Sequence, residues 1–230
     1  MALKDELSSE VAKIFGDRWE ERDGTVVPES EDLTLGNDAV KLNAVVLYAD
    51  MADSTALVDK NKPHFAAEVY KAYLHCAAKV VRNWGGEITA YDGDRLMAVF
   101  IGNSKNTSAV TAALKLNYTR LQIINPAIKV QYPNTSYELK HVVGIDTSEL
   151  FIARTGARGA NDLVWVGRAA NHAAKLSALS HEYAINITKE VYDCMDKSVK
   201  FDAAGSNMWE AATWNTMNRN IYRSNYTWSI

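Results

Sequence analysis

The segment VLYADMADST, residues 46–55, holds the residues whose types and spacing best suit metal and phosphate chemistry. Its apolar start predicts a buried strand that ends at Asp50, and the Asp, Ser and Thr that follow predict the first turn of a helix, with Asp53 as its cap. A carboxylate at the end of a strand can bind a metal ion, and the free backbone N–H groups at the start of the next helix can donate hydrogen bonds to phosphate oxygens. The segment therefore indicates a site for a metal ion and its phosphates. A strand that ends in a capped turn, with no ligand, is the alternative.

A second carboxylate, Asp94, stands between two apolar runs in the segment YDGDR, residues 91–95. An Asp-Gly pair in that position predicts a β-hairpin turn. A right-handed crossover from the first strand through a helix brings the hairpin beside that strand, so that Asp50 faces Asp94. Two adjacent carboxylates repel each other unless a cation lies between them. Two metals about 3.5–4 Å apart would activate an attacking oxygen and stabilise phosphate oxygens. Asp92 is interpreted as a turn former and Asp53 as a helix cap.

Asn171 and Lys175 are four residues apart in a segment with helical apolar spacing, so they share one face of the predicted helix. An amide that holds a sugar and a cation that neutralises phosphate charge would both be useful beside a triphosphate. The alternative is that the two residues form the solvated side of the helix. The histidines show no metal-ligand spacing, and structural roles are assigned to His141, His172 and His181.

Length and composition favour one domain with appendages. The chain has 230 residues, 47% of them hydrophobic, and a net charge of −3. It has no long basic run, which argues against nucleic-acid binding, and no apolar stretch of membrane-spanning length. The charged start does not resemble a signal peptide. Cys76 and Cys194 lie far apart without zinc-site spacing, so reduced cysteines in a cytoplasmic protein, without a membrane or nucleic-acid partner, are expected.

The hydrophobic periodicity predicts an ordered series of elements. They are an amphipathic helix over 5–21, a polar connector over 22–43, the strand ending at Asp50, a helix over 63–84, the hairpin over 86–100, a helix over 106–124, strands over 139–146 and 149–153 joined by a turn at 146–148, a Gly-rich loop over 155–161, a strand over 163–166, a helix over 168–179 and a strand over 184–188. This order suits an α/β (α+β) ferredoxin-like βαββαβ sandwich. The predicted domains are 1–43 (N-terminal helix and connector), 44–199 (catalytic domain) and 200–230 (C-terminal extension packed on that domain).

Four segments, in order along the chain, resemble the motifs of the class III nucleotide cyclases, which include adenylate and guanylate cyclases. VLYADMADST is similar to the family's first metal-binding motif, DGDRLMAVF to the second, VGIDTSEL to the strand that follows, and LVWVGRAANHAAKL to the segment with the transition-state residues. The resemblance covers roughly residues 44–199. Gly85-Gly86-Glu87 is similar to a motif of cyclic-dinucleotide synthases, but there it occupies the hairpin turn, whereas here it precedes the hairpin.

The resemblance implies a metal-dependent cyclase that acts as a dimer. By position, Asp50 and Asp94, with the backbone carbonyl of Met51, would hold two divalent ions, Mg²⁺ or Mn²⁺. Asn171 matches the family's transition-state Asn. The family's Arg falls on Lys175, which keeps the charge but loses the planar two-pronged donor geometry. The ribose 3′-OH would attack the α-phosphorus and pyrophosphate would leave. Since the family's metal residues and Asn/Arg pair come from different subunits, a head-to-tail homodimer with two shared sites is implied.

The residues at the base-recognition positions differ from those of the purine cyclases. Ala90 stands where those enzymes have Lys or Glu, and Val164 stands where a polar residue is usual. Both side chains that would form hydrogen bonds with a purine base are therefore absent. Tyr48 replaces a common Phe and places a hydroxyl near the expected base or ribose. These departures resemble the pyrimidine nucleotide cyclases of bacterial antiphage systems, which make cyclic UMP or cyclic CMP. That resemblance implies a partner effector that senses the cyclic nucleotide.

The sequence therefore predicts a uridylate cyclase, a lyase that converts UTP to 3′,5′-cyclic UMP and pyrophosphate as a second messenger in antiphage defence. UTP and CTP differ at one edge of the ring and no residue separates them, so a cytidylate cyclase is the first alternative. A purine cyclase with an unusual base pocket is the next, and a catalytically silent nucleotide-binding module, favoured by Lys175, is the last. The Trp- and Tyr-rich tail is expected to cover the sheet, with Arg219 or Arg223 reaching the triphosphate.

Overall fold

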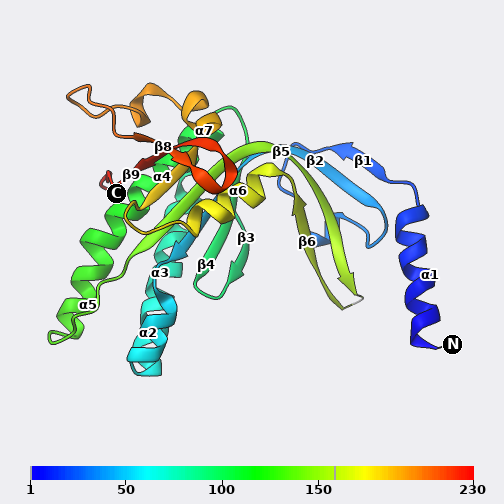
Figure 1. The fold of residues 1–230 in the computed structure, drawn as a ribbon, viewed down its shortest axis with the longest axis horizontal. Helices are drawn as coiled ribbons and strands as arrows, with labels where there is room; N and C mark the ends of the chain where they lie inside the picture. The colour runs from blue at the N-terminus through cyan, green and yellow to red at the C-terminus, as the bar shows by residue number, and fades with distance from the viewer. Residues whose placement is uncertain (1, 158) are drawn as a thin grey trace. The chain divides into compact units, whose positions relative to one another are not determined.

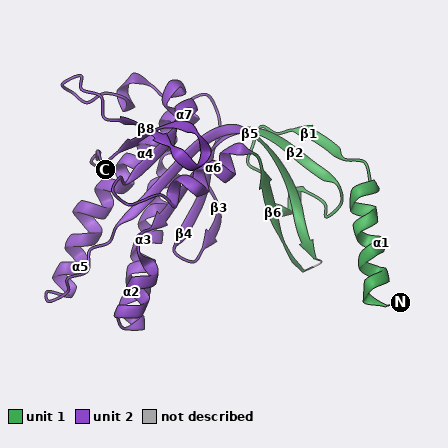
Figure 2. Cartoon of the chain, viewed as in Figure 1, with its two compact units in different colours: residues 1–43, 149–167 green, residues 44–148, 168–230 purple. Residues whose placement is uncertain are grey.

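The computed structural model describes residues 2–157 and 159–230 (Figure 1), and two compact units are distinguished in the chain. Unit 1 consists of residues 1–43 and 149–167, and unit 2 of residues 44–148 and 168–230 (Figure 2). Two long strands, β2 (Asp38–Met51) and β5 (His141–Ala157), contribute residues to both units. The predicted division into domains 1–43, 44–199 and 200–230 stays a prediction.

Unit 2 is built on a mixed sheet with the strand order β3-β4-β2-β5-β7-β9-β8. The additional strands are β3 (Glu87–Asp92), β4 (Arg95–Phe100), β7 (Ile185–Thr188), β8 (Glu210–Trp214) and β9 (Arg219–Ser224). β4 is antiparallel to both β2 and β3, whereas β5 and β7 are parallel. The order of β3, β4, β2 and β5, with helices after β2 and β4, is that of a ferredoxin-like βαββαβ sandwich, which confirms the predicted fold class.

The helices of unit 2 pack on both faces of this sheet, most of them on the side of the hydrophobic core and the one at Arg168–Ser177 on the side of the candidate site. They are α2 (Ser54–Lys60), α3 (Pro63–Asn83), α4 (Lys105–Thr119), a π-helical turn (Arg120–Ile124), α5 (Asn125–Gln131), α6 (Arg168–Ser177) and α7 (Lys189–Cys194), with 3₁₀ turns at Lys197–Val199 and Asn215–Met217. Alternate residues of β2, from Val45 to Met51, share a hydrophobic core with α3 and α4. Because strand side chains alternate between faces, Tyr48 and Asp50 point to the opposite face.

Unit 1 contains α1 (Leu3–Gly16), β1 (Glu20–Asp23), a 3₁₀ turn (Ser30–Asp32), β6 (Ala160–Val166) and parts of β2 and β5. β1 pairs in parallel with the start of β2, and β6 pairs antiparallel with the end of β5. Trp19 packs edge-on against Phe151, with ring centroids 5.0 Å apart. The helix predicted over 5–21 thus ends at Gly16, and the predicted connector includes β1 and the start of β2. None of the residues of α1 is buried.

The predicted turn at 146–148 is wrong, because β5 runs unbroken through it. Asp, Thr and Ser favour turns locally, but here tertiary contacts override that preference. Thr147 Oγ1 donates to the carbonyl of Ala44, 3.2 Å away, and Asp146 and Ser148 face α6. The predicted Gly-rich loop over 155–161 is also wrong at both ends, since β5 continues to Ala157 and β6 begins at Ala160. Residue 158 of that loop lies outside the described residues.

Three smaller predictions also need correction. Asp53 precedes α2 but has a left-handed backbone (φ 58°) and makes no side-chain capping hydrogen bond, so its cap role is wrong. The helix predicted to end at residue 124 continues through the π-helical turn into α5, and Figure 1 shows α4 and α5 as one long rod. The C-terminal tail extends the sheet through β8 and β9 instead of covering it. In the described part of the chain, no helix is long and apolar enough to cross a membrane.

Candidate active site

The β3–β4 hairpin brings the two predicted metal carboxylates of unit 2 together. Asp50 of β2 lies opposite Arg95 of β4, and Arg95 lies opposite Asp92 of β3. Only Gly93 and Asp94 remain to make the turn, and Gly93 adopts a positive φ of 61° that glycine tolerates without strain. Asp94, in the turn, therefore lies next to the cross-strand row formed by Asp50, Arg95 and Asp92.

The surroundings of the Asp50 carboxylate contain too little positive charge to stabilise its ionised form. Burial and the neighbouring Asp94 raise the pKa of Asp50 to about 6, against the smaller opposing effect of Arg95. The Arg95 guanidinium is already bound to Asp92, with Nη2 2.5 Å from Oδ2. Within the described residues no side chain donates a hydrogen bond to Asp50. A half-buried carboxylate beside a second one, without its own counter-ion, is an environment that a divalent cation stabilises.

The donor chemistry of this corner fits a hard divalent ion. The carboxylate oxygens of Asp50 and Asp94 and the nearby backbone of Met51 are the oxygen ligands that Mg²⁺ and Mn²⁺ prefer. The described residues contain no group of three or more His, Cys, Asp or Glu with metal-binding geometry. The fit therefore rests on two carboxylates, and their role as metal ligands stays a prediction.

A row of three side chains lies next to the carboxylates on the same face of the sheet. Tyr48 and Ala90 are both cross-strand partners of Met97, and directly opposed residues share a face. The Tyr48 hydroxyl lies 3.1 Å from the Met97 sulfur, and the Arg95 guanidinium lies over the Tyr48 ring, 5.3 Å from its centre. The row thus presents an aromatic ring, a thioether and a methyl group, with no charged group at position 90.

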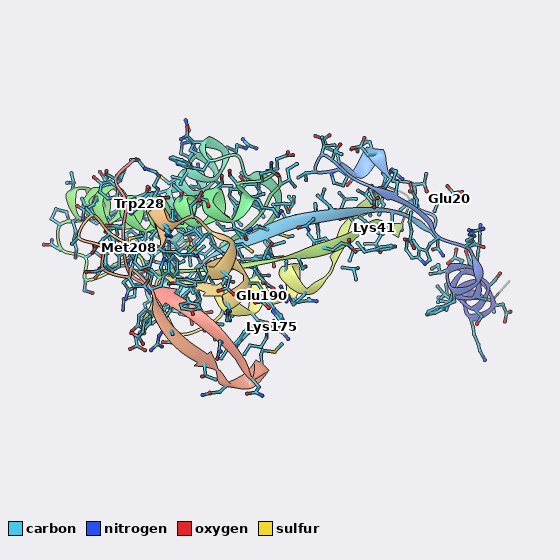
Figure 3. The ribbon with its side chains drawn as sticks, turned by 90° about the horizontal axis from the view of Figure 1, so that it is seen from above. Glu20, Lys41, Lys175, Glu190, Met208 and Trp228 are labelled. Atoms are coloured by element: carbon cyan, nitrogen blue, oxygen red, sulfur yellow. The ribbon has the colours of Figure 1, made fainter. Side chains whose placement is uncertain are left out.

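The predicted pair on α6 is exposed and available for a ligand. Asn171 and Lys175 are both exposed on this helix of unit 2, and Lys175 is labelled in Figure 3. The Lys175 ammonium has the sulfur of Met217 at 3.8 Å, a weak acceptor that leaves its charge unneutralised. Val164, the second predicted base-reading position, belongs to unit 1, where it lies in β6 opposite Ala153 with 38% of its surface exposed.

The structure also places residues that sequence reasoning did not assign to the site. Arg95 and Met97 belong to the rows described above, and a two-residue hairpin turn would have predicted that Arg95 opposes Asp92. Their pairing with β2 depends on the register across a helical crossover, which no local signal specifies. The two arginines expected to reach the triphosphate are engaged elsewhere, Arg219 with Glu190 and Arg223 with Glu210.

Comparisons with known proteins identify the family and the fold. The model of the Adenylate and Guanylate cyclase catalytic domain matches residues 39–218. The chain is 51% identical to a protein named uridylate cyclase from Xanthomonas perforans and 48% identical to one from Burkholderia cepacia, with all of both chains covered in each case. Its fold is similar to that of a bacterial light-regulated adenylyl cyclase, with a TM-score of 0.68 and 18% identity over 83% of this chain and 54% of that one.

Proposed function

This chain belongs to the Adenylate and Guanylate cyclase catalytic domain family and is a nucleotide cyclase, a lyase, and we propose that its substrate is UTP and its product 3′,5′-cyclic UMP. The predicted membership of the class III cyclases is thereby confirmed. Full-length identity of 51% and 48% to two proteins named uridylate cyclase is the observation that carries the choice of substrate. Ala90 supports it, because a methyl group offers no hydrogen bond to a purine edge.

The proposed reaction forms one bond and breaks another at the α-phosphorus. The ribose 3′-oxygen bonds to that phosphorus, the bond to the bridging oxygen of pyrophosphate breaks, and the 3′-hydroxyl proton passes to solvent. Class III cyclases generally depend on divalent metals, and we place two such ions at Asp50, Asp94 and the carbonyl of Met51. When bound, the ions would lower the pKa of the attacking hydroxyl and neutralise phosphate charge.

The remaining groups of this chain would bind and orient the nucleotide. Tyr48 offers a ring face and a hydroxyl to the base or ribose. The Asn171 amide would hold the ribose, and the Lys175 ammonium would stabilise negative charge that develops on the transferred phosphate. Since the family's two groups of residues come from different subunits, we propose a head-to-tail homodimer in which α6 of one copy completes the metal site of the other.

Competition among the four nucleoside triphosphates tests the substrate. Purified protein is incubated with Mn²⁺ and equal ATP, GTP, CTP and UTP, and cyclic products are resolved by mass spectrometry. Cyclic UMP should dominate. Predominant cyclic CMP would identify a cytidylate cyclase, and predominant cyclic AMP or GMP a purine cyclase. If a folded, dimeric protein converts none of the four, the chain is a nucleotide-binding module and the proposal is wrong.

We also propose a role in antiphage defence, in which a cytoplasmic enzyme makes cyclic UMP as a second messenger for a separate effector. Measurement of cyclic UMP in cells before and after phage infection tests this role. A rise that depends on Asp50 is expected. Unchanged cyclic UMP in infected cells that contain active enzyme would contradict it, without affecting the choice of substrate.

A further inference from the structure

One face of β5 forms a docking surface for α6 within unit 2. Gly144, Asp146 and Ser148 are at alternate positions of the strand and so share a face, opposite the face that Val143 and Ile145 direct into the core. Each of the three contacts α6, at successive points along it. α6 has only 10 residues, a length at which an isolated helix is marginal, so its orientation depends on this surface.

Gly144 sets how closely the helix approaches. A Cβ atom at this position would lie 2.2 Å from the carbonyl oxygen of Ala173 and 2.5 Å from the amide nitrogen of Ser177. Both are backbone atoms of α6, which cannot move without moving the helix. At the other end of the surface, the hydroxyl of Ser148 accepts a 3.0 Å hydrogen bond from the backbone N–H of Ala169 in the first turn of α6.

Asp146, between these two contacts, is held by side chains of α6 and β7. Its side chain is fully buried. Its carboxylate accepts hydrogen bonds from Arg168 Nε at 3.1 Å and from Thr188 Oγ1 of β7 at 2.5 Å. His172 Nδ1 lies 3.2 Å away, on the same side of α6 as Arg168. A buried carboxylate that loses such partners is strongly destabilised, so the arrangement has one preferred geometry.

The Arg168 guanidinium extends the same network to both sides. It donates to the carbonyl of Thr147 at 2.5 Å and to Glu190 Oε1 at 2.9 Å. Glu190, labelled in Figure 3, is the second residue of α7 and also pairs with Arg219. The planar, multi-donor guanidinium is held from three directions, which an ammonium could not reproduce.

We propose that Asp146 is a positioning residue for the nucleotide cyclase reaction, which acts through Arg168 and His172 to fix the direction in which α6 presents Asn171 and Lys175. This inference rests on the proposed function. Asn171 is adjacent to His172, and Lys175 is one turn further along, so any rotation of the docked face turns the exposed face equally. Misplacement by about 1 Å at such groups is enough to slow a reaction about 10²-fold.

The first test separates turnover from substrate binding. In Asp146→Asn the carbonyl oxygen still accepts from Thr188, but the charge that holds Arg168 is gone. We expect kcat for cyclic nucleotide formation to fall about 10–100-fold, with KM for the triphosphate and the Mn²⁺ dependence within about 3-fold of the wild type. Arg168→Lys should give the same pattern more weakly, and it serves as the readout if Asp146→Asn does not fold. The matched control is Lys189→Met, which removes an exposed ion pair with Asp193 and should leave both constants unchanged.

The second test uses mixed dimers to locate the defect. Asp146→Asn mixed with Asp50→Ala should recover activity, because one of the two shared sites then has an intact metal half and an intact α6 half. Asp146→Asn mixed with Asn171→Ala should show no such recovery, since every site then has a damaged α6. Where Asp50→Ala and Asn171→Ala complement each other, recovery in both mixtures or in neither would show that Asp146 does not act through α6.

The outcomes separate this inference from the function on which it rests. Wild-type protein without cyclase activity overturns the proposed function and this inference with it. If the wild type is active but a mixture of Asp50→Ala and Asn171→Ala does not recover activity, only the shared dimer is overturned. The kinetic test then decides whether Asp146 is a positioning residue. A rise in KM at unchanged kcat, or a loss of kcat only in proportion to a loss of folded protein, means that Asp146 has a structural role and no positioning role.

Discussion

Two aspartates on adjacent strands of unit 2, Asp50 on β2 and Asp146 on β5, have opposite environments. Asp146 is fully buried and surrounded by an arginine, a threonine hydroxyl and a histidine. Asp50 is half-buried, faces an arginine that is bound to another carboxylate, and has a second aspartate beside it, so its pKa is raised to about 6.

The difference shows how one residue type serves two purposes in the same sheet. A carboxylate whose partners come from its own chain is saturated, and removing one partner leaves a costly buried charge. A carboxylate that lacks such partners can bind an external cation. When that cation is absent, the ionised carboxylate destabilises the folded protein. Asp146 has the first environment and Asp50 the second, in keeping with the roles proposed for them. The following changes test this contrast, from the largest expected effect to the smallest.

Asp50→Ala and Asp94→Ala should each abolish measurable cyclisation, with a loss of about 10³-fold or more, because they remove the carboxylates proposed to hold the metal ions. Cyclic nucleotide production with Mn²⁺ measures the effect, and circular dichroism establishes that the variants are folded. Asp92→Asn is the matched control on the same hairpin and should retain most activity. If Asp92→Asn is as inactive as Asp94→Ala, the assignment of carboxylates in the turn is wrong.

Asn171→Ala should lower kcat about 10²–10³-fold, the usual cost of removing one transition-state hydrogen-bond donor. Lys175→Arg, which restores the family residue, should keep or raise activity, whereas Lys175→Ala should lower it. Steady-state kinetics with UTP provides the comparison. Equal activity of the Lys175→Ala variant and the wild type would remove Lys175 from the proposed mechanism.

Gly144→Ala should destabilise the protein by about 1–3 kcal/mol and reduce activity, because the added methyl group meets the backbone of α6. Denaturant unfolding measures the change in the free energy of unfolding. Gly16→Ala is the control, since a Cβ there has no heavy atom within 4 Å and the residue has no positive φ. A stable and active Gly144→Ala variant would show that α6 does not depend on this close approach.

Asp50→Asn should stabilise the metal-free protein at pH 7–8 by about 1–2 kcal/mol, after allowance for the solvent exposure of the side chain. Because the folded-state pKa of Asp50 is raised, the wild-type carboxyl group contributes its stability at low pH and loses it as the pH rises through about 6. The advantage of the variant should therefore disappear below about pH 4. A variant less stable than the wild type at pH 8 would contradict the unsaturated environment of Asp50.

His141 should produce the opposite pH dependence. It is completely buried in unit 2, its ring lies edge-on to that of Tyr73, and burial together with nearby Arg120 lowers its pKa well below 6.5. The unfolded chain then binds a proton that the folded protein excludes, so stability should fall below about pH 6.5, by up to about 1.4 kcal/mol per pH unit. Unfolding curves of His141→Gln should lack this part of the slope. An unchanged slope would show that other groups cause the acid sensitivity.

The sequence by itself determined the elements whose signals are local. The Asp-Gly hairpin, the long helix that begins at Pro63 and the strand that contains Asp50 follow from turn chemistry and periodicity, and their order was enough to predict the ferredoxin-like fold. Asp50, Asp94, Asn171 and Lys175 were named from residue type, spacing and resemblance, and their roles stay predictions.

Only the tertiary structure decided what depends on contacts between distant segments. The turn expected at 146–148 is strand because Thr147 and its neighbours bond to β2 and α6, contacts that no local preference encodes. The opposition of Asp50 to Arg95 required the register between strands that are joined through α3. The contrast between Asp50 and Asp146 has the same origin, because the partners of a carboxylate come from other segments of the chain and its own sequence neighbourhood does not specify them.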